Sequence, residues 1–294
     1  MILRDVKKNK VKTGFIVTFF FVIVALFIYF VSLWLFDDTI IAIIIGVLFS
    51  FFSSFISYYN SDKIVLSLNK ARVATKEEYR QINDILEGLC LGSGLPMPKL
   101  YIMEDSAMNA FATGRNPKHA VICVTTGLLN RLDKYEIEGV LAHELSHIKN
   151  YDILLSTVAV VMVGFIVIIS DLFSRGFYRR SRDDDDNKAN GILMIIGLIF
   201  IILAPIFAKL IQLAISRNRE YLADSSAVEI TRNKDGLINA LKKIDMDTEV
   251  LENANKASES LYIINPLKGK KAKDSLFSTH PNTLNRIERL QNIQ

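Results

Sequence analysis

The chain has 294 residues, of which 50% are hydrophobic and 22% are charged, and its mean hydropathy is +0.27. This concentration of apolar residues excludes an ordinary soluble domain. The formal net charge of +4 is modest, and the basic residues lack interleaved aromatic side chains, which excludes a nucleic-acid-binding protein. The two cysteines, Cys90 and Cys123, have no metal-like spacing, so we expect two buried thiols in a reducing compartment.

Two apolar segments near the N-terminus are long enough to cross a membrane. Residues 14–36 carry no charge, and neither do residues 39–59, which follow the acidic pair Asp37 and Asp38. Each segment exceeds the roughly 18–20 residues that span about 30 Å of hydrocarbon as a helix. The first is too long for the apolar region of a cleaved signal peptide. Residues 1–60 are therefore predicted to form a retained two-span anchor.

Basic residues flank this anchor on both sides. Four lysines precede the first span, and Lys63, Lys70 and Arg72 follow the second, whereas the turn between the spans carries only acids. By the positive-inside rule, both ends of the hairpin face the cytoplasm. We therefore expect a multi-pass protein of the plasma membrane, with residues 61–152 forming the first part of a cytoplasmic domain.

The cytoplasmic residues 61–152 have a mixed helix and strand pattern. Apolar residues at three- and four-residue steps predict a helix over residues 76–91, which glycine and proline residues end. Three short strand-like runs follow it, and they start at Lys99, Ala107 and Ala120. A second helix is predicted to begin near Asp133 as the N-cap, with Glu136 three residues later as its partner in a capping box.

The second helix carries the sequence HELSH. His143 and His147 are four residues apart, so both imidazoles project from one helix face and can bind one ion at about 2.0–2.1 Å. Glu144, on the adjacent face, can take a proton from a zinc-bound water as that water attacks a carbonyl. The chain has only four histidines, so chance rarely produces this spacing. The alternative is a pair of structural histidines on a helix face.

A catalytic zinc needs a third protein ligand and an open fourth position. No third histidine follows at the extended spacing, so a carboxylate on another helix is the most economical source. Glu220, in SRNREYLAD, is the best candidate, although it also suits a surface ion pair with Arg217 or Arg219. Asp224, one turn later, can accept the outer N–H of a ligand histidine. The fourth histidine, His280, is either an ordinary polar residue or a transition-state donor.

Two further apolar segments separate HELSH from Glu220. Residues 153–170 and 191–208 are candidate spans of minimum length, joined by a charged loop. Glu220 and the histidines must meet at one ion, so residues 153–215 are predicted to form a membrane hairpin that returns to the same side. Residues 216–294 are then the second part of the catalytic domain. The basic residues of the loop oppose full insertion, which leaves partial insertion as the alternative.

The motifs NAFATG, HELSH, SRNREYLAD and STHPNTLNRI occur in an order that resembles the HtpX membrane zinc metalloproteases. They also resemble the wider group that includes the CAAX prenyl endopeptidases, and the match covers nearly the whole chain. The resemblance implies one zinc ion per chain, bound by His143, His147 and Glu220. It also implies that Glu144 is the catalytic base and that Asp224 supports a ligand.

The same resemblance implies roles for two further parts of the chain. It places four residues beside the substrate cleft, where an extended peptide adds by backbone pairing: Asn109, Ala110, Phe111 and Ala112. It makes His280 a supporting residue of the site and Arg286 a structural residue.

The expected fold is α+β, a multi-span helical membrane protein with a zincin-like catalytic domain made of the HELSH helix and a small sheet. The resemblance implies an endopeptidase that degrades misfolded or damaged membrane proteins, often under stress. The expected partners are the membrane and polypeptide substrates. One alternative is a processing protease of narrow specificity, for example for a prenylated peptide. Another is a membrane scaffold or metal-storage protein, which would not need Glu144 between its ligands.

Overall fold

The computed structural model describes residues 2–36, 39–75, 77–161, 217–252, 258–264 and 281–293. Its helices are α1 (Ile2–Phe36), α2 (Thr39–Tyr59), α3 (Ser61–Leu68), α4 (Arg80–Ser93), α5 (Thr126–Arg131), α6 (Lys134–Lys149), α9 (Arg217–Thr231), α10 (Lys234–Met246) and α11 (Thr283–Gln291). Its strands are β1 (Arg72–Val73), β2 (Lys99–Met103), β3 (Ala110–Gly114) and β4 (Ala120–Thr125). Residues 152–161 are also helical. Most of the predicted second hairpin, from residue 162 to 216, lies outside the described residues, as does His280.

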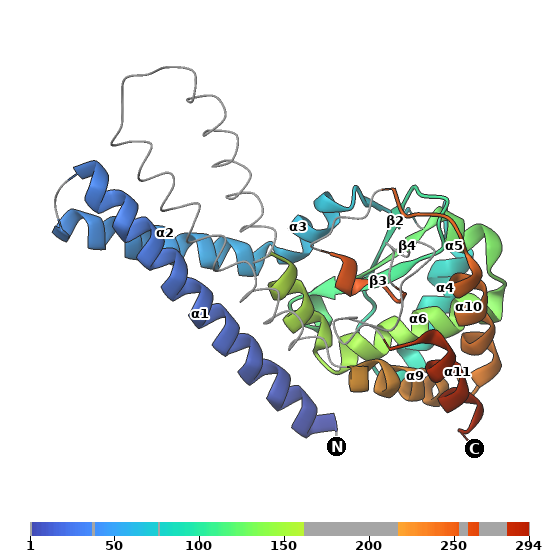
Figure 1. Ribbon diagram of the computed structural model, residues 1–294. Coiled ribbons are helices and arrows are strands. Elements are labelled where there is room, and N and C mark those ends of the chain that lie inside the picture. Colours follow the sequence, from blue (N-terminus) through green and yellow to red (C-terminus); the bar gives the residue numbers. More distant parts are fainter. Residues whose placement is uncertain are drawn as a thin grey trace.

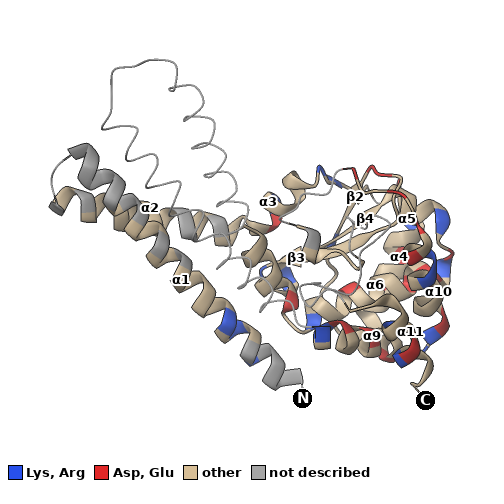
Figure 2. Ribbon diagram, viewed as in Figure 1, with Lys and Arg blue, Asp and Glu red and all other residues tan. Residues whose placement is uncertain are grey.

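The helices α1 and α2 pack together as a long hairpin that extends away from the sheet and its helices (Figure 1). Charged residues concentrate outside this hairpin, on the helices that surround the sheet (Figure 2). Among the described residues, one helical stretch is long and apolar enough to cross a membrane, Asn9–Leu26, and α2 adds a shorter apolar stretch, Ile43–Phe52. Large apolar side chains of α2, including Phe51 and Phe55, are exposed. This exposure suits contact with lipid, and the two-span anchor stays a prediction.

The four strands form a mixed sheet in the order β1-β2-β4-β3. Strand β2 runs parallel to β4, while β1 and β3 run antiparallel to their neighbours. Strands β2, β3 and β4 confirm the three strands predicted from the sequence, and the two-residue strand β1 was not predicted. The small sheet among many helices confirms the α+β class, and it leaves β3 at one edge.

Helix α6 begins at the predicted N-cap. The carboxylate of Asp133 accepts a hydrogen bond from Glu136 N at 3.0 Å, and Glu136 Oε2 accepts one from Asp133 N at 2.8 Å. The apolar face of the helix is buried in the main core, and it consists of Ile137, Leu141, Leu145 and Ile148. Burying each such side chain contributes about 1.5–3 kcal/mol, so this face fixes α6 against the core. The histidine face is then free to meet α9, which packs beside α6.

Helices α6 and α10 cross at two glycines. A Cβ atom added to Gly139 would lie 2.7 Å from Leu237 N, and one added to Gly236 would collide with Tyr135 O. The two backbones therefore touch with no side chain between them. Helix α10 follows α9 after a short turn capped by Asn233, so the same crossing brings α9 alongside α6.

Candidate metal centre

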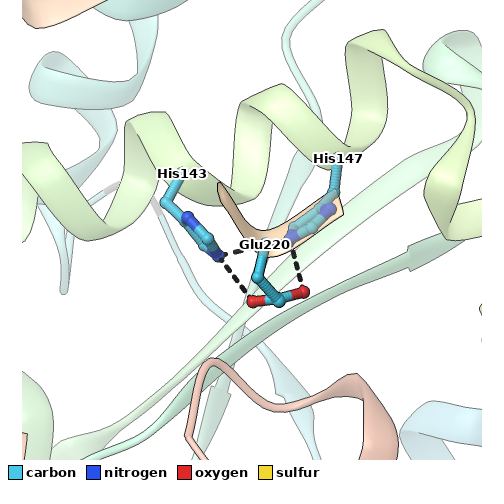
Figure 3. A group of neighbouring side chains, drawn as sticks. All are labelled: His143, His147 and Glu220. Carbon is cyan, nitrogen blue, oxygen red and sulfur yellow. Dashed lines mark hydrogen bonds and ion pairs between the residues drawn. The ribbon is translucent and has the colours of Figure 1, made fainter. Parts of the chain in front are cut away.

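Two helices bring three metal-binding side chains to one point (Figure 3). His143 and His147 come from α6 and Glu220 comes from α9, and one ligand atom from each lies within 4.8 Å of the others. His143 Nε2 is 3.6 Å from Glu220 Oε2, His147 Nε2 is 3.5 Å from Glu220 Oε1, and the two Nε2 atoms are 3.2 Å apart. Ligands that bind a tetrahedral zinc at about 2.0–2.1 Å lie roughly 3.3–3.5 Å from one another. The distance between the two Nε2 atoms is close to this spacing, and so is the distance from each of them to one oxygen of Glu220, a different oxygen for each histidine.

Glu220 faces the interior. Glu220 is only 6% exposed. The buried face of α9 consists of four residues at helical spacing: Glu220, Ala223, Asp224 and Ala227. This burial argues against the surface ion pair that the sequence left open. Glu220 and Asp224 are one turn apart on this face, so one helix supplies both a ligand and a support for a ligand.

His143 is fully buried and is held by α9 and α11. Its Nδ1 is 3.0 Å from Asp224 Oδ1. Arg286, on α11, donates to both oxygens of Asp224 at 2.8 and 2.6 Å, and to Ile263 O at 2.8 Å. Burial lowers the pKa of His143, but hydrogen bonds with Asp224 and Glu220 outweigh it and raise the pKa to about 9. Burial raises the pKa of Asp224, yet Arg286 holds it below its usual range.

His147 is held by the turn that follows α6. Its Nδ1 is 3.2 Å from Asp152 Oδ2. Tyr151 has a φ of 59°, in the left-handed region that non-glycine residues rarely adopt, and this conformation turns the chain so that Asp152 points back at His147. Burial lowers the pKa of His147, but the hydrogen bond with Asp152 and the negative charges of Glu220 and Asp152 together outweigh it, so the net shift of the pKa is upward.

Both imidazoles direct Nδ1 to a carboxylate and Nε2 to the other ligands. A neutral histidine that donates its Nδ1–H has a lone pair on Nε2, so two lone pairs face each other beside the carboxylate of Glu220. Such a group needs a cation, or an extra proton, to offset the repulsion. Two imidazoles with outer carboxylate partners and one carboxylate ligand are the donor set of catalytic zinc sites. The residues present therefore fit zinc.

Glu144 lies in the cleft next to these ligands. The cleft is lined by Ala112, Glu144, His147, Glu220 and Ser260, among others. Glu144 is 1% exposed, and within the described part of the chain its Oε1 has no hydrogen-bond partner. Burial raises the pKa of Glu144, while the positive charge on the nearby histidines opposes the shift. A carboxylate with a raised pKa beside the ligands is suited to accept a proton from water.

Strand β3 borders the cleft and has one open backbone position. In the antiparallel pair with β4, alternate residues Ala110, Ala112 and Gly114 turn their backbone groups outward. Ala110 O accepts a hydrogen bond from Ile263 N at 2.9 Å, and Gly114 N donates to Thr157 Oγ1 at 3.2 Å. An antiparallel bridge between Phe111 and Tyr262 pairs the outward N–H of Ala112 with the chain at Leu261, whereas the C=O of Ala112 binds no other group that the structure describes.

The other residues of the NAFA segment hold residues 258–264 against this strand. Asn109 Nδ2 donates to Ile264 O at 3.0 Å, and the ring of Phe111 packs edge-on against Tyr262 with centroids 5.1 Å apart. Of the four residues predicted to contact substrate, the structure places Ala112 in the cleft. Asn109 and Phe111 are buried beneath the chain that covers them.

Sequence reasoning gave Asp152 no role at the metal site and expected Arg286 to be structural, yet the structure places both beside the ligand histidines. Arg286 left a signal, because it shares the helical stripe of α11 that is buried: Thr283, Arg286, Ile287 and Leu290. An arginine on an apolar stripe must be paired with an acid. Asp152 left a weaker signal, as an acid at the start of an apolar run.

Comparison with known proteins agrees with this geometry. The model of peptidase family M48 matches residues 76–294. The chain is 45% identical to a protease HtpX homologue of Listeria monocytogenes over 100% of both chains. It is 46% identical to one of Dictyoglomus thermophilum over 97% of this chain and 93% of that one. The crystal structure of S. mikatae Ste24p matches with a TM-score of 0.51 and 19% identity, and 62% of that longer chain is covered by 90% of this one.

The fold, the ligand set and these matches define a metalloprotease, an enzyme that hydrolyses peptide bonds in polypeptides. The chain belongs to peptidase family M48, and within that family it is an HtpX-like protease. The predicted resemblance is thereby confirmed.

Proposed function

We propose that the chain is an integral, multi-pass zinc endopeptidase of the plasma membrane that hydrolyses misfolded or damaged membrane proteins, as part of protein quality control under stress. The observation that carries the proposal is the convergence of His143, His147 and Glu220 on one point beside Glu144. The domain division follows the sequence, with an anchor in residues 1–60, a catalytic domain in 61–152 and 216–294, and a membrane hairpin in 153–215. The flanking basic residues put the catalytic domain in the cytoplasm.

The residues of the site divide the chemistry between them. His143, His147 and Glu220 would hold a zinc ion, which would supply a Lewis acid that polarises the peptide carbonyl and makes a water molecule more acidic. Glu144 takes the proton of the attacking water and delivers it to the leaving amine. Asp224 and Asp152 keep Nδ1 of each histidine protonated, so that Nε2 faces the metal. His280 is assigned to stabilising the transition state, on the family resemblance.

The outward C=O of Ala112, on the edge of β3, is the proposed pairing point for substrate. An extended peptide that adds to a sheet edge is bound through main-chain hydrogen bonds. Such binding depends little on side chains, so it suits the varied segments that damaged membrane proteins expose. The anchor would hold this cleft close to the membrane surface.

Substitution of the base tests the mechanism. The full-length protein is purified in detergent without zinc, and cleavage of casein and of the protein itself is followed after zinc is added. We expect Glu144→Gln to lower the cleavage rate about 100- to 10,000-fold, because proton transfer to a positioned base contributes about that much. The matched control is Glu138→Gln, the same change on the same helix but outside the cleft, which should cleave like the wild type. A wild-type rate for Glu144→Gln would refute the proposal.

The same assay separates the alternatives. Zinc binding without any cleavage by the wild type would favour a scaffold or metal-storage protein. Cleavage of a single prenylated peptide, with casein untouched, would favour a processing protease of narrow specificity.

A further inference from the structure

The N-terminal helix α1 reaches the metal centre through one buried side chain, Asn9, which is 4% exposed. Asn9 Nδ2 donates to Asp152 Oδ1 at 2.8 Å and to Asn150 O at 3.0 Å, and Asn9 Oδ1 accepts from Arg219 Nη2 at 2.8 Å. The amide thus uses both donor and acceptor on residues more than a hundred positions away in the chain. An amide that uses both of its N–H donors and its oxygen in this way holds its partners in fixed orientations.

The partners of Asn9 belong to the two segments that deliver metal ligands. Asp152 uses one oxygen for Asn9 and places the other, Oδ2, 3.2 Å from His147 Nδ1. Arg219 directly precedes Glu220, and its Nε lies 3.4 Å from Asp152 Oδ1. Asn9 therefore binds the carboxylate that contacts the ligand His147. It also binds the side chain of Arg219, the residue that precedes the ligand Glu220.

The two oxygens of the Asp152 carboxylate have different partners, and this explains how Asn9 can act on His147. A carboxylate rotates easily about its last bond, because that torsion has only broad minima. Asn9 and Arg219 both bind Oδ1 of Asp152, which leaves Oδ2 for His147. Loss of the amide would remove the uncharged donor, and the ring of His147 would lose part of its orientation.

We propose that Asn9 is a positioning residue of the metal centre, which fixes the carboxylate of Asp152 and, through it, the imidazole of His147. The first helix is then a working part of the site as well as its anchor. This inference rests on the proposed function, because it takes His147 to be a metal ligand.

The test measures zinc affinity of the full-length protein in detergent, by competition with a chelating dye. We expect Asn9→Ala to weaken zinc binding about tenfold, the lower end of the effect of removing an outer partner of a ligand, and to lower kcat with KM unchanged. Val11→Ala is the matched control. It shortens a side chain of the same helix that is 65% exposed. Zinc affinity of Val11→Ala should be unchanged.

Two further variants separate positioning from simple packing. Asn9→Asp keeps the size of the side chain but sets an acceptor against Asp152 Oδ1, so it should weaken zinc at least as much as Asn9→Ala. In an Asp152→Asn background, Asn9→Ala should cause little further loss, because two residues that act through one contact are not additive.

Several outcomes would overturn the inference. They are wild-type zinc affinity for Asn9→Asp, additive losses in the double variant, or an equal loss for Val11→Ala. A wild-type protein that binds no zinc would instead refute the proposed function, so the two failures are distinguishable.

Discussion

The two histidines of the metal centre are supported by different parts of the molecule. His143 meets Asp224 of α9, whose carboxylate is gripped by an arginine of α11, and all these groups are buried. His147 meets Asp152, in the turn that leads into an apolar helix, and that carboxylate is bound by Asn9 of α1. One support lies within the helices α6, α9 and α11, whereas the other involves the N-terminal helix α1. A single metal site can thus combine an internal half with a half that depends on α1.

The two supports also differ in access to water. The side chain of His143 is 0% exposed, while that of His147 is 15% exposed and lines the cleft. A charge left without its partner is costly where water cannot reach it and less so where water can. Changes on the His143 side should therefore affect both folding and metal binding, and changes on the His147 side mainly metal binding.

The largest effect is expected for Arg286→Met. It leaves Asp224 buried without its main charge partner, so the free energy of unfolding of the zinc-free protein should fall by about 3–5 kcal/mol. Urea unfolding in detergent measures this. The control is Arg289→Met on the exposed side of the same helix, which loses a contact with the Tyr221 ring and should cost about 0.5–1 kcal/mol. Equal losses for the two variants would show that the buried pair of Arg286 and Asp224 stabilises the fold no more than an exposed contact does.

An intermediate effect is expected for Asp152→Asn. Zinc affinity should fall about 10- to 100-fold, as for other outer partners of ligand histidines, with little change in urea unfolding of the zinc-free protein. Asp224→Asn should weaken zinc to a similar extent and also destabilise the fold, because it leaves Arg286 buried without its anion. If Asp152→Asn destabilised the fold as strongly as Asp224→Asn, the two supports would not differ as described.

The smallest effect on zinc affinity is expected from a change of one pH unit. The pKa of His143 in the zinc-free protein is raised to about 9, so zinc must displace its proton, and zinc affinity should rise about tenfold per pH unit up to that value. Stability of the zinc-free protein has the opposite sign. The folded-state pKa exceeds the ordinary value of 6.5, so this stabilisation is complete below about 6.5 and is lost as pH rises through 9. Zinc competition and urea unfolding between pH 6 and 9 check both signs, and zinc-free stability that rose over this interval would contradict the assignment.

Sequence predicts the parts of the site that local geometry determines. The cap of α6 joins residues three apart, and the ligand histidines are four apart, so helical spacing alone places them. The pair Glu220 and Asp224 is equally local, but its meeting with the histidines had to be inferred from the count of ligands that zinc requires. The second hairpin and His280 stay predictions, since they lie outside the described residues.

The remaining parts depend on contacts that spacing does not report. Asn9 and Asp152 are 143 residues apart, and nothing in either local pattern links them. Three strands were predicted from their apolar runs, but the order β1-β2-β4-β3 arises from packing. Only that order puts β3 at the edge, where Tyr262, 151 residues further along the chain, forms an antiparallel bridge with Phe111.

The glycine crossing of α6 and α10 has a mechanical consequence. Gly139 lies against the backbone at Leu237, and Gly236 lies against the carbonyl of Tyr135. If one helix slid along the other, a residue next to one of these glycines would take its place, and the Cβ atom of that residue would collide with main chain. The crossing therefore fixes the position of α6 along its own axis. Because α9 packs against both α6 and α10, the crossing also helps to fix the distance between the imidazoles of α6 and the carboxylate of α9, where the cation would bind.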